Sequence, residues 1–246
     1  MLNVQTLLQT EAAAEGYYTT ALPATPSRPI RIFVPENFQS RYAYPLLILF
    51  HGRGGNEEQV LRTVPLISRR NFLGASVRGP ETIGARGDGG TACGWAEGSP
   101  ADCAGAVADA VRLLRRQHNI HPQRIYLVGM NDGAAAAYRA AFALGDQVAG
   151  VIAINGTLPR TQGKLPLFHL DQVRRQRVLI CQSTTATTVE DLDVLRDRKL
   201  FYAAGAEVAY RRFRSVAAVP PEMLRETNRW IIDQIHAAPA VPSAAK

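Results

Sequence analysis

Hydrophobic residues gather in short segments whose lengths and spacing predict strands and helices in alternation. Several segments are unbroken apolar runs of strand length, the pattern of strands that are buried on both faces of a sheet. Others alternate between apolar and polar residues, which is typical of a strand with one exposed face. The expected strands are residues 30–35, 45–50, 72–77, 125–128, 148–155, 177–182 and 207–213.

Segments with apolar residues at helical spacing lie between these strands. Asn56 suits the N-cap of one helix, Gly205 suits the position after another, and Pro221 suits the first turn of the last. The expected helices are residues 57–69, 101–117, 132–144, 189–204 and 221–235. Residues 78–100 are rich in glycine and lack an apolar period, so we expect a long loop there, of the kind that is often functional.

This alternation predicts the α/β fold class. A single domain is expected, with a mainly parallel, twisted sheet and helices on both of its faces. No internal repeat or linker divides the chain. The expected organisation is a partly flexible N-terminal arm with one short helix at residues 1–29, the α/β domain at 30–236 and a flexible tail at 237–246.

Composition is that of an ordinary globular protein. The chain has 246 residues, 46% of them hydrophobic, so it can bury one sizeable core. No apolar run approaches the roughly 18 residues of a membrane helix, and no membrane span is expected. The first residues lack a basic segment, and Glu11 and Glu15 interrupt any apolar core. A secretory signal is therefore not expected, and we predict a cytoplasmic protein.

Charge and cysteine content exclude several classes of function. The net charge of +7 comes mainly from scattered arginines, without the long basic run or aromatic-rich basic stretch of a nucleic-acid site. Three cysteines cannot form a closed set of disulfides, and neither they nor the histidines have metal-ligand spacing. We expect Cys93, Cys103 and Cys181 to be partly buried free thiols, with no nucleic acid, metal or cofactor bound.

The most informative segment is "RIYLVGMNDGAAAAYRAAFAL", residues 124–144. An apolar strand leads into a turn bounded by glycines and then into an alanine-rich helix. An α/β-hydrolase carries its nucleophile at such a turn, in the pattern G-x-S-x-G. Here the pattern is Gly129-Met130-Asn131-Asp132-Gly133, so a neutral amide occupies the position of the serine.

Residues 30–235 as a whole resemble the carboxylesterase/phospholipase branch of the α/β-hydrolase superfamily. The resemblance rests on the order and spacing of the elbow glycines and of the segments "PLLILFHGRGGNEE", "SVRGP", "NIHPQRIYLVGM", "AAGAEVAYRRF" and "PPEMLRETNRWI". It implies a single-domain α/β-hydrolase fold. It also implies a mechanism in which a histidine takes the proton of the nucleophilic serine and an acid orients that histidine.

The resemblance further implies that the catalytic triad has been lost. The acid of the family lies in a pattern like G-x-x-D-x-x-V-P, and Ala186 occupies its position within residues 183–190. The histidine lies in a pattern like G-G-H-x-V-P-P, and Ala217 occupies its position within residues 215–221. Together with Asn131, these residues leave no functional catalytic group in any of the three positions.

The oxyanion loop of the family is retained. Its segment, His51 to Gly55, follows the first central strand, and its backbone N–H groups together with that of Asp132 can form an oxyanion hole. We therefore place Arg53, Gly54, Asp132 and His51 in the oxyanion-hole and pocket region. His51 is expected to be structural, as such a histidine usually is in this motif, and Asp132 to place a favourable negative charge at a helix N-terminus.

Three functions are compatible with these residues. The first is an inactive carboxylesterase-like protein with a binding or scaffolding role, whose partner is a small acyl- or ester-like ligand or another protein. The second is an active ester hydrolase with rearranged catalytic residues, such as His51 or Asp132. The third is an interaction protein whose pocket is closed. The remaining histidines, expected away from the pocket, are His118, His121, His169 and His236.

Overall fold

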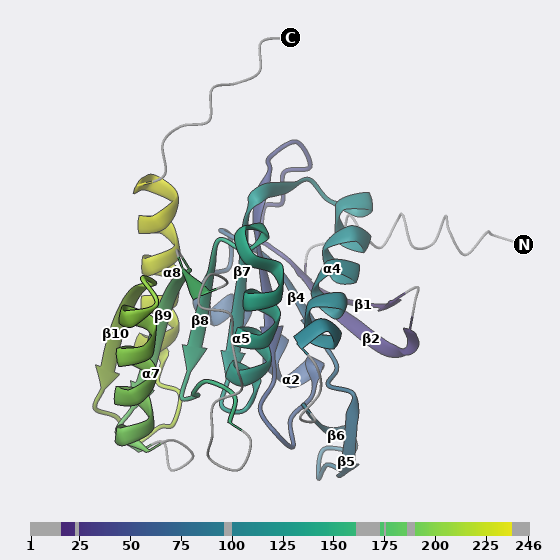
Figure 1. Ribbon diagram of the computed structural model, residues 1–246. Helices are drawn as coiled ribbons and strands as arrows, with labels where there is room; N and C mark the ends of the chain where they lie inside the picture. Colours follow the sequence, from purple (N-terminus) through teal and green to yellow (C-terminus); the bar gives the residue numbers. More distant parts are fainter. Residues whose placement is uncertain are drawn as a thin grey trace, which may run out of the picture.

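The computed structural model describes residues 16–22, 25–95, 100–160, 173–174, 176–185 and 190–237. In this part of the chain an eight-stranded sheet lies between two layers of helices (Figure 1). The strands of the sheet are β1 (Gly16–Leu22), β2 (Thr25–Val34), β3 (Tyr44–Phe50), β4 (Leu73–Val77), β7 (Ile120–Met130), β8 (Gly150–Ile154), β9 (Arg177–Ser183) and β10 (Glu207–Phe213).

The strand order confirms the mainly parallel sheet. From one edge to the other it is β1-β2-β4-β3-β7-β8-β9-β10. The β1–β2 and β2–β4 pairs are antiparallel, and every later neighbouring pair in this order is parallel. The carboxyl ends of β3, β7, β8, β9 and β10 therefore meet at one end of the sheet, where loops from different strands can form a common site.

Helices cover the two faces of this sheet. The helices are α2 (Glu57–Leu61), α3 (Val64–Ile67), α4 (Pro100–Gln117), α5 (Gly133–Leu144), α7 (Asp191–Ala203) and α8 (Pro221–Ala237), with a short 3-10 helix η1 (Gly145–Gln147). One core contains residues of α4, α5 and α7, which lie on the near face in Figure 1. The other core contains residues of α2, α3 and α8.

The central strand β3 shows why its sequence is an unbroken apolar run. Leu46, Ile48 and Phe50 point into the first core, whereas Leu47 and Leu49 point into the second. All five side chains have no exposed surface. A strand buried on both faces needs apolar residues at successive positions, so the run predicts the strand and its central place.

The N-terminal edge of the sheet differs from the sequence expectation. Strand β1 and the first half of β2 lie within the segment 1–29 that the sequence assigns to an arm with a short helix. Tyr17 lies opposite Phe33, with ring centroids 5.4 Å apart. An edge strand has only one neighbour and needs no continuous apolar run, so its sequence carries a weak signal. Residues 1–15 and most of the proposed tail, 238–246, lie outside the described residues.

The helix expected at residues 57–69 is divided in two. Asn56 caps α2 as expected, and its Oδ1 accepts a hydrogen bond from the N–H of Gln59 at 2.9 Å. Pro65 lies in the first turn of α3. Proline has no N–H to donate and its ring collides with a preceding carbonyl, so a continuous helix through this residue is disfavoured.

The loop expected at residues 78–100 contains a hairpin. Its strands are β5 (Glu81–Ala85) and β6 (Thr91–Gly94), at one end of the molecule in Figure 1. β5 is largely exposed, which explains the absence of an apolar period. The hairpin is held by residues distant in sequence, because the N–H of Gly54 donates to the Cys93 carbonyl and the N–H of Cys93 donates to the Gly55 carbonyl, both at 2.8 Å.

Two further sequence expectations concern thiols and membranes. Cys93, Cys103 and Cys181 are free and buried, and burial raises the pKa of the Cys181 thiol. Within the described ranges, no helix has both the length and the apolar character needed to cross a bilayer. The cytoplasmic location stays a prediction.

The first testable prediction concerns His118, which follows α4 and is buried against the ring of Phe38. Burial lowers the pKa of His118 from 6.5 to about 4. Below pH 6.5, the ordinary pKa of histidine, His118 takes up a proton in the unfolded chain, whereas burial keeps it neutral in the folded chain. The contribution of His118 to the free energy of unfolding is therefore complete above pH 6.5 and is lost as the pH falls toward 4, by up to about 3 kcal/mol.

Urea unfolding of wild type and His118→Gln between pH 4 and pH 7 measures this effect. We expect the variant to show a smaller loss of unfolding free energy at low pH, because glutamine does not titrate. His236→Gln, at an exposed position near the end of α8, is the matched control and should follow wild type. Parallel pH profiles for wild type and His118→Gln would show the prediction to be wrong.

Candidate functional site

Asn131 lies at the turn where β7 passes into α5. Its φ angle is +50°, in the left-handed region that non-glycine residues rarely adopt and that asparagine tolerates best. Its N–H donates to the Ile154 carbonyl at 2.8 Å, and its carbonyl accepts from the N–H of Ala134 at 3.0 Å. The backbone geometry of a nucleophile elbow is thus present, with a partly buried amide side chain at its tip.

Close backbone approaches hold this elbow in place. A Cβ atom at Gly129 would collide with the backbone of Gly133 and Ala134, and one at Gly133 would collide with the carbonyl of Phe50. A Cβ atom at Gly156 would collide with the carbonyl of Asn131. Glycine is therefore required at each position, and the two elbow glycines noted in the sequence have a direct steric reason.

His51 lies at the start of the glycine-rich loop after β3 and is buried. Its Nε2 accepts a hydrogen bond from the N–H of Gly79 at 2.9 Å. Its Nδ1 therefore carries the proton, and it lies 2.8 Å from the carbonyl of Gly52, to which it donates. Burial lowers the pKa of His51, which keeps the ring neutral. The ring thus joins the glycine-rich loop to the segment after β4, so this histidine has a structural position.

The backbone N–H groups of the oxyanion region differ in whether they are already hydrogen-bonded within the protein. The N–H of Gly54 donates to the Cys93 carbonyl, and the N–H of Gly55 donates to the carbonyl of Gly52 at 3.0 Å. Neither amide is free to bind an oxyanion, so Gly54 does not have the expected role. In the described chain, no backbone acceptor is found for the amides of Arg53 and Asp132. The N–H groups of these two residues therefore remain as hydrogen-bond donors beside the elbow.

Ala217 lies in the exposed loop after β10. Its carbonyl accepts hydrogen bonds from the hydroxyls of Ser183 and Thr185, both at 3.2 Å. The loop in which the resemblance places the catalytic histidine therefore contacts the start of the segment in which it places the acid. Ala186 itself lies outside the described residues. Since alanine offers only a methyl group, the 217 position supplies no base.

Asn155 is a site residue that the sequence analysis missed. It follows β8 with a φ angle of +49°. Its Oδ1 accepts from the N–H of Ser183 at 2.7 Å, and its Nδ2 donates to the carbonyl of Ala218. One amide side chain thus joins the ends of β8 and β9 to the loop after β10. The available signal was a polar residue directly after a buried strand.

A cavity of about 300 Å³ lies over the elbow. It is bounded by the glycine-rich loop, the start of α5 and the segment after β8. Arg53 and Asp132, which the sequence places here, line it, whereas His51 and Gly54 are not among its lining residues. The polar and aromatic side chains on its wall are Arg53, Trp95, Asn131, Asp132, Arg139, Asn155, Thr157 and Arg160.

The three arginines of this cavity have different partners. Arg53 makes a two-pronged ion pair with Glu81, with both N–O distances 3.0 Å. Arg160 pairs with the buried Asp197. Burial raises the pKa of Asp197, while the N–H of Leu158 and the Arg160 guanidinium oppose that rise. For Arg139 the described residues supply neither a hydrogen bond nor an ion pair.

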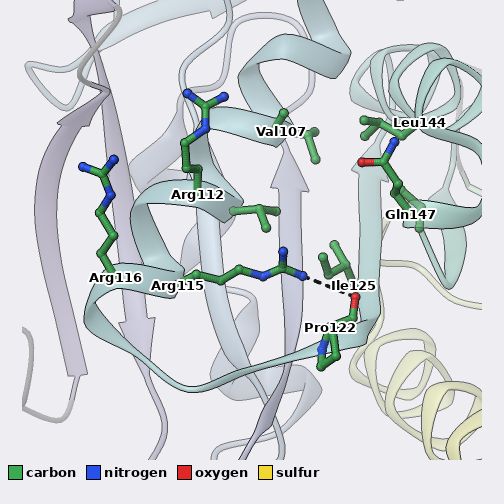
Figure 2. A pocket seen from close by; sticks show the side chains of 11 residues that line it. Val107, Arg112, Arg115, Arg116, Pro122, Ile125, Leu144 and Gln147 are labelled. Atoms are coloured by element: carbon green, nitrogen blue, oxygen red, sulfur yellow. Dashed lines mark hydrogen bonds between the residues drawn. The ribbon is translucent and has the colours of Figure 1, made fainter.

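A larger cavity, of about 640 Å³, lies at the other end of the sheet. Figure 2 shows Arg115 extending across it to the carbonyl of Pro122, at 3.3 Å. It is lined by α4, the start of β7 and the end of α5. Ligands of open α/β sheets bind beyond the carboxyl ends of the strands, and these residues lie at the amino end of β7. The smaller cavity is therefore the candidate site.

The other described histidines belong to elements away from the elbow. His118 follows α4, His121 lies near the start of β7, and His236 lies near the end of α8. Within the described ranges no histidine hydrogen-bonds to Asn131 or Asp132, while His169 falls outside those ranges. The described residues also contain no group of three or more His, Cys, Asp or Glu side chains that could hold a metal ion.

Comparison with solved structures finds esterases and carboxylesterases. A fungal esterase from Rhizomucor miehei has a TM-score of 0.66 and 13% identity, over 94% of this chain and 90% of the neighbour. A carboxylesterase from Mesorhizobium loti has a TM-score of 0.65 and 16% identity, over 87% and 98%. The Bacillus cereus carboxylesterase has a TM-score of 0.60 and 17% identity, over 94% and 100%.

These likenesses confirm the α/β-hydrolase fold that the sequence motifs imply. The sequence itself matches no family model and no curated protein. At such low identity the comparison concerns the fold alone, so the chemistry of this chain has to be argued from its own residues.

The steric role of the elbow glycines yields a second prediction. Gly133→Ala should lower the free energy of unfolding by about 3 kcal/mol, because its methyl group has no space beside the carbonyl of Phe50. Gly105→Ala is the matched control, since a Cβ atom at that α4 position meets nothing within 4 Å. It should raise the unfolding free energy by about 0.5–1 kcal/mol through helix propensity. Urea denaturation of both variants gives the comparison, and equal effects would contradict the steric argument.

Proposed function

We propose that this α/β-hydrolase-fold chain is an esterase-like binding protein that does not hydrolyse esters through a serine triad. The observation that carries the proposal is Asn131 at the tip of the elbow, with a φ angle of +50° and the glycines that the turn requires. The backbone scaffold of an acyl-transfer site is retained, while the side chain that would attack a carbonyl is replaced by an amide.

The side chains at the elbow support the absence of hydrolysis through a serine triad. A carboxamide is not a useful nucleophile near neutral pH, and a serine or water nucleophile needs a base to take its proton. Both nitrogens of His51 are already hydrogen-bonded to backbone, Nδ1 to Gly52 of its own loop and Nε2 to Gly79 after β4, and position 217 is an alanine. Loss of a whole triad lowers turnover about a millionfold, and an oxyanion hole with binding alone retains roughly a thousandfold over water. That remainder is too small for an esterase.

The cavity over the elbow supports binding as the retained role. Its volume, about 300 Å³, is at the lower limit of small-ligand sites, which range over about 300–1,000 Å³. The N–H groups of Arg53 and Asp132 and the amide side chain of Asn131 offer polar contacts. An open cavity weighs against an interaction protein with a closed pocket. A hydrolase with rearranged residues has less support, because no base is found beside Asn131 or Asp132 in the described chain.

The third prediction tests catalysis directly. Wild-type protein should hydrolyse p-nitrophenyl acetate no faster than an unrelated protein surface, since the described residues place no base beside Asn131 to activate a nucleophile. Asn131→Ser alone should remain inactive for the same reason. Asn131→Ser combined with Ala186→Asp and Ala217→His should give a burst of p-nitrophenol from acyl-enzyme formation, because the elbow and its N–H donors are retained. Stopped-flow absorbance measures the burst.

A matched control for the triple variant carries histidine one residue later. Ala218→His, combined with the same changes at 131 and 186, adds the same groups in a different register and should show no burst. Wild-type turnover that disappears in His51→Gln would overturn the proposal, since it would identify an active hydrolase with an unusual base.

A further inference from the structure

Arg139 is a buried arginine without an acidic partner, and it lines the cavity over the elbow. It lies in α5 among alanines and aromatic residues, with only 8% of its surface exposed. The described residues supply it with no hydrogen bond, ion pair or ring contact. Its unpaired nitrogens are not among the polar atoms sealed from solvent. The guanidinium therefore reaches the cavity space.

An arginine in this position is costly unless something pairs with it. The guanidinium carries five N–H donors, cannot lose its charge under ordinary conditions and has no acceptor of its own. Buried charges in proteins are paired, and a buried polar group without a partner calls for a functional explanation. Packing does not supply one, because α5 has short apolar residues at most of its other positions. The missing partner of Arg139 has to enter through the cavity.

The charges around Arg139 define what that partner is. Arg53 and Arg160 also line the cavity, but Glu81 and Asp197 pair with them. Asp132 is the acidic residue on the wall; it is exposed and makes no ion pair with Arg139 within the described ranges. The site therefore has one uncompensated positive charge and a negative group nearby, an arrangement that suits a single negative charge better than two.

The start of α5 contributes to the same electrostatic field. α5 has 12 residues, and its N-terminus lies at the cavity wall with Asn131 and Asp132. The N–H groups at a helix N-terminus carry partial positive charge and favour anions. The free amides of Arg53 and Asp132 add donors on the same side. Arg139 indicates an anion independently of these N–H groups, because it carries a full positive charge and has no partner in the described chain.

We propose that the cavity binds a small monocarboxylate whose two oxygens pair with the guanidinium of Arg139. The planar fork of arginine matches a carboxylate in a two-pronged arrangement. A volume of about 300 Å³ accommodates an acid of a few carbon atoms, and Asp132 disfavours a dianion such as phosphate. This inference rests on the proposed binding function and specifies the ligand class of that site.

The ligand-free stability of the protein provides one test. If Arg139 is present for binding, Arg139→Met should raise the thermal midpoint by about 2–4 °C in buffer without carboxylates, because the variant removes an unpaired buried charge and retains the side-chain volume. If Arg139 has a structural partner instead, the same substitution should lower the midpoint. Differential scanning calorimetry of the full chain distinguishes the two outcomes.

Titration with propionate provides the second test. Isothermal titration calorimetry should show binding to wild type, with affinity lowered about tenfold or more in Arg139→Met, since a two-pronged charge-assisted pair is lost. Arg139→Lys keeps the charge but not the fork, and its affinity should lie between those of wild type and Arg139→Met. Arg116→Met is the matched control, because Arg116 lines the cavity at the other end of the sheet. It removes the same charge and should bind propionate like wild type.

Several outcomes would overturn the proposal. Absence of propionate binding by wild type would do so, as would equal affinity in wild type and Arg139→Met. Binding of inorganic phosphate in preference to propionate would also contradict it. Sodium chloride at matched ionic strength corrects for general screening. A failure here is separate from a failure of the proposed function, because ester turnover is measured with a different substrate and depends on position 131. If Arg139→Met does not fold, the propionate affinities of wild type and Arg139→Lys still test the proposal, because the lysine variant should bind more weakly.

Discussion

The structure depends on one close contact, where the start of α5 packs against the end of β3. Gly133 lies against the carbonyl of Phe50 with no space for a side chain, and Gly129 lies equally close to the first residues of α5. This contact forces a sharp turn at Asn131, which fixes the end of β7 beside the glycine-rich loop. The cavity, the free amides and the first helix turn all take their positions from it. A larger residue at either glycine would displace them together.

Backbone geometry and side-chain chemistry have separate physical requirements at this turn. The turn needs glycines and a residue that tolerates the left-handed region, and asparagine satisfies that need. Hydrolysis by a serine triad needs a serine, a base and an acid, and none of these is provided by the backbone. A chain can therefore keep the elbow while its catalytic groups are replaced. His51 shows the same separation, because its nitrogens bond to the backbone of Gly52 and of Gly79 and neither is available to a reacting group.

The charged side chains around the cavity differ in how they are compensated within the protein. Arg160 and Asp197 form a buried pair, and Arg53 and Glu81 form an exposed one. In each pair, the carboxylate neutralises the charge of its arginine. Arg139 lacks such compensation in the described chain, and an unpaired buried charge lowers stability. Proteins keep such a group where it contributes to function, which is the usual basis of a conflict between stability and activity.

The sequence by itself determined the fold class and the state of the elbow. Unbroken apolar runs such as residues 45–50 predict central strands, since both faces of the sheet are covered, and the glycine spacing around Asn131 predicts the turn. The tertiary structure alone decided the edge strand β1, the hairpin β5–β6 and the pairing of each polar side chain. Hydrogen bonds between distant segments produce these features, and local patterns do not encode their partners. Arg139 appears in the sequence as one arginine in an alanine-rich helix, and only packing reveals that its charge is buried and faces the cavity.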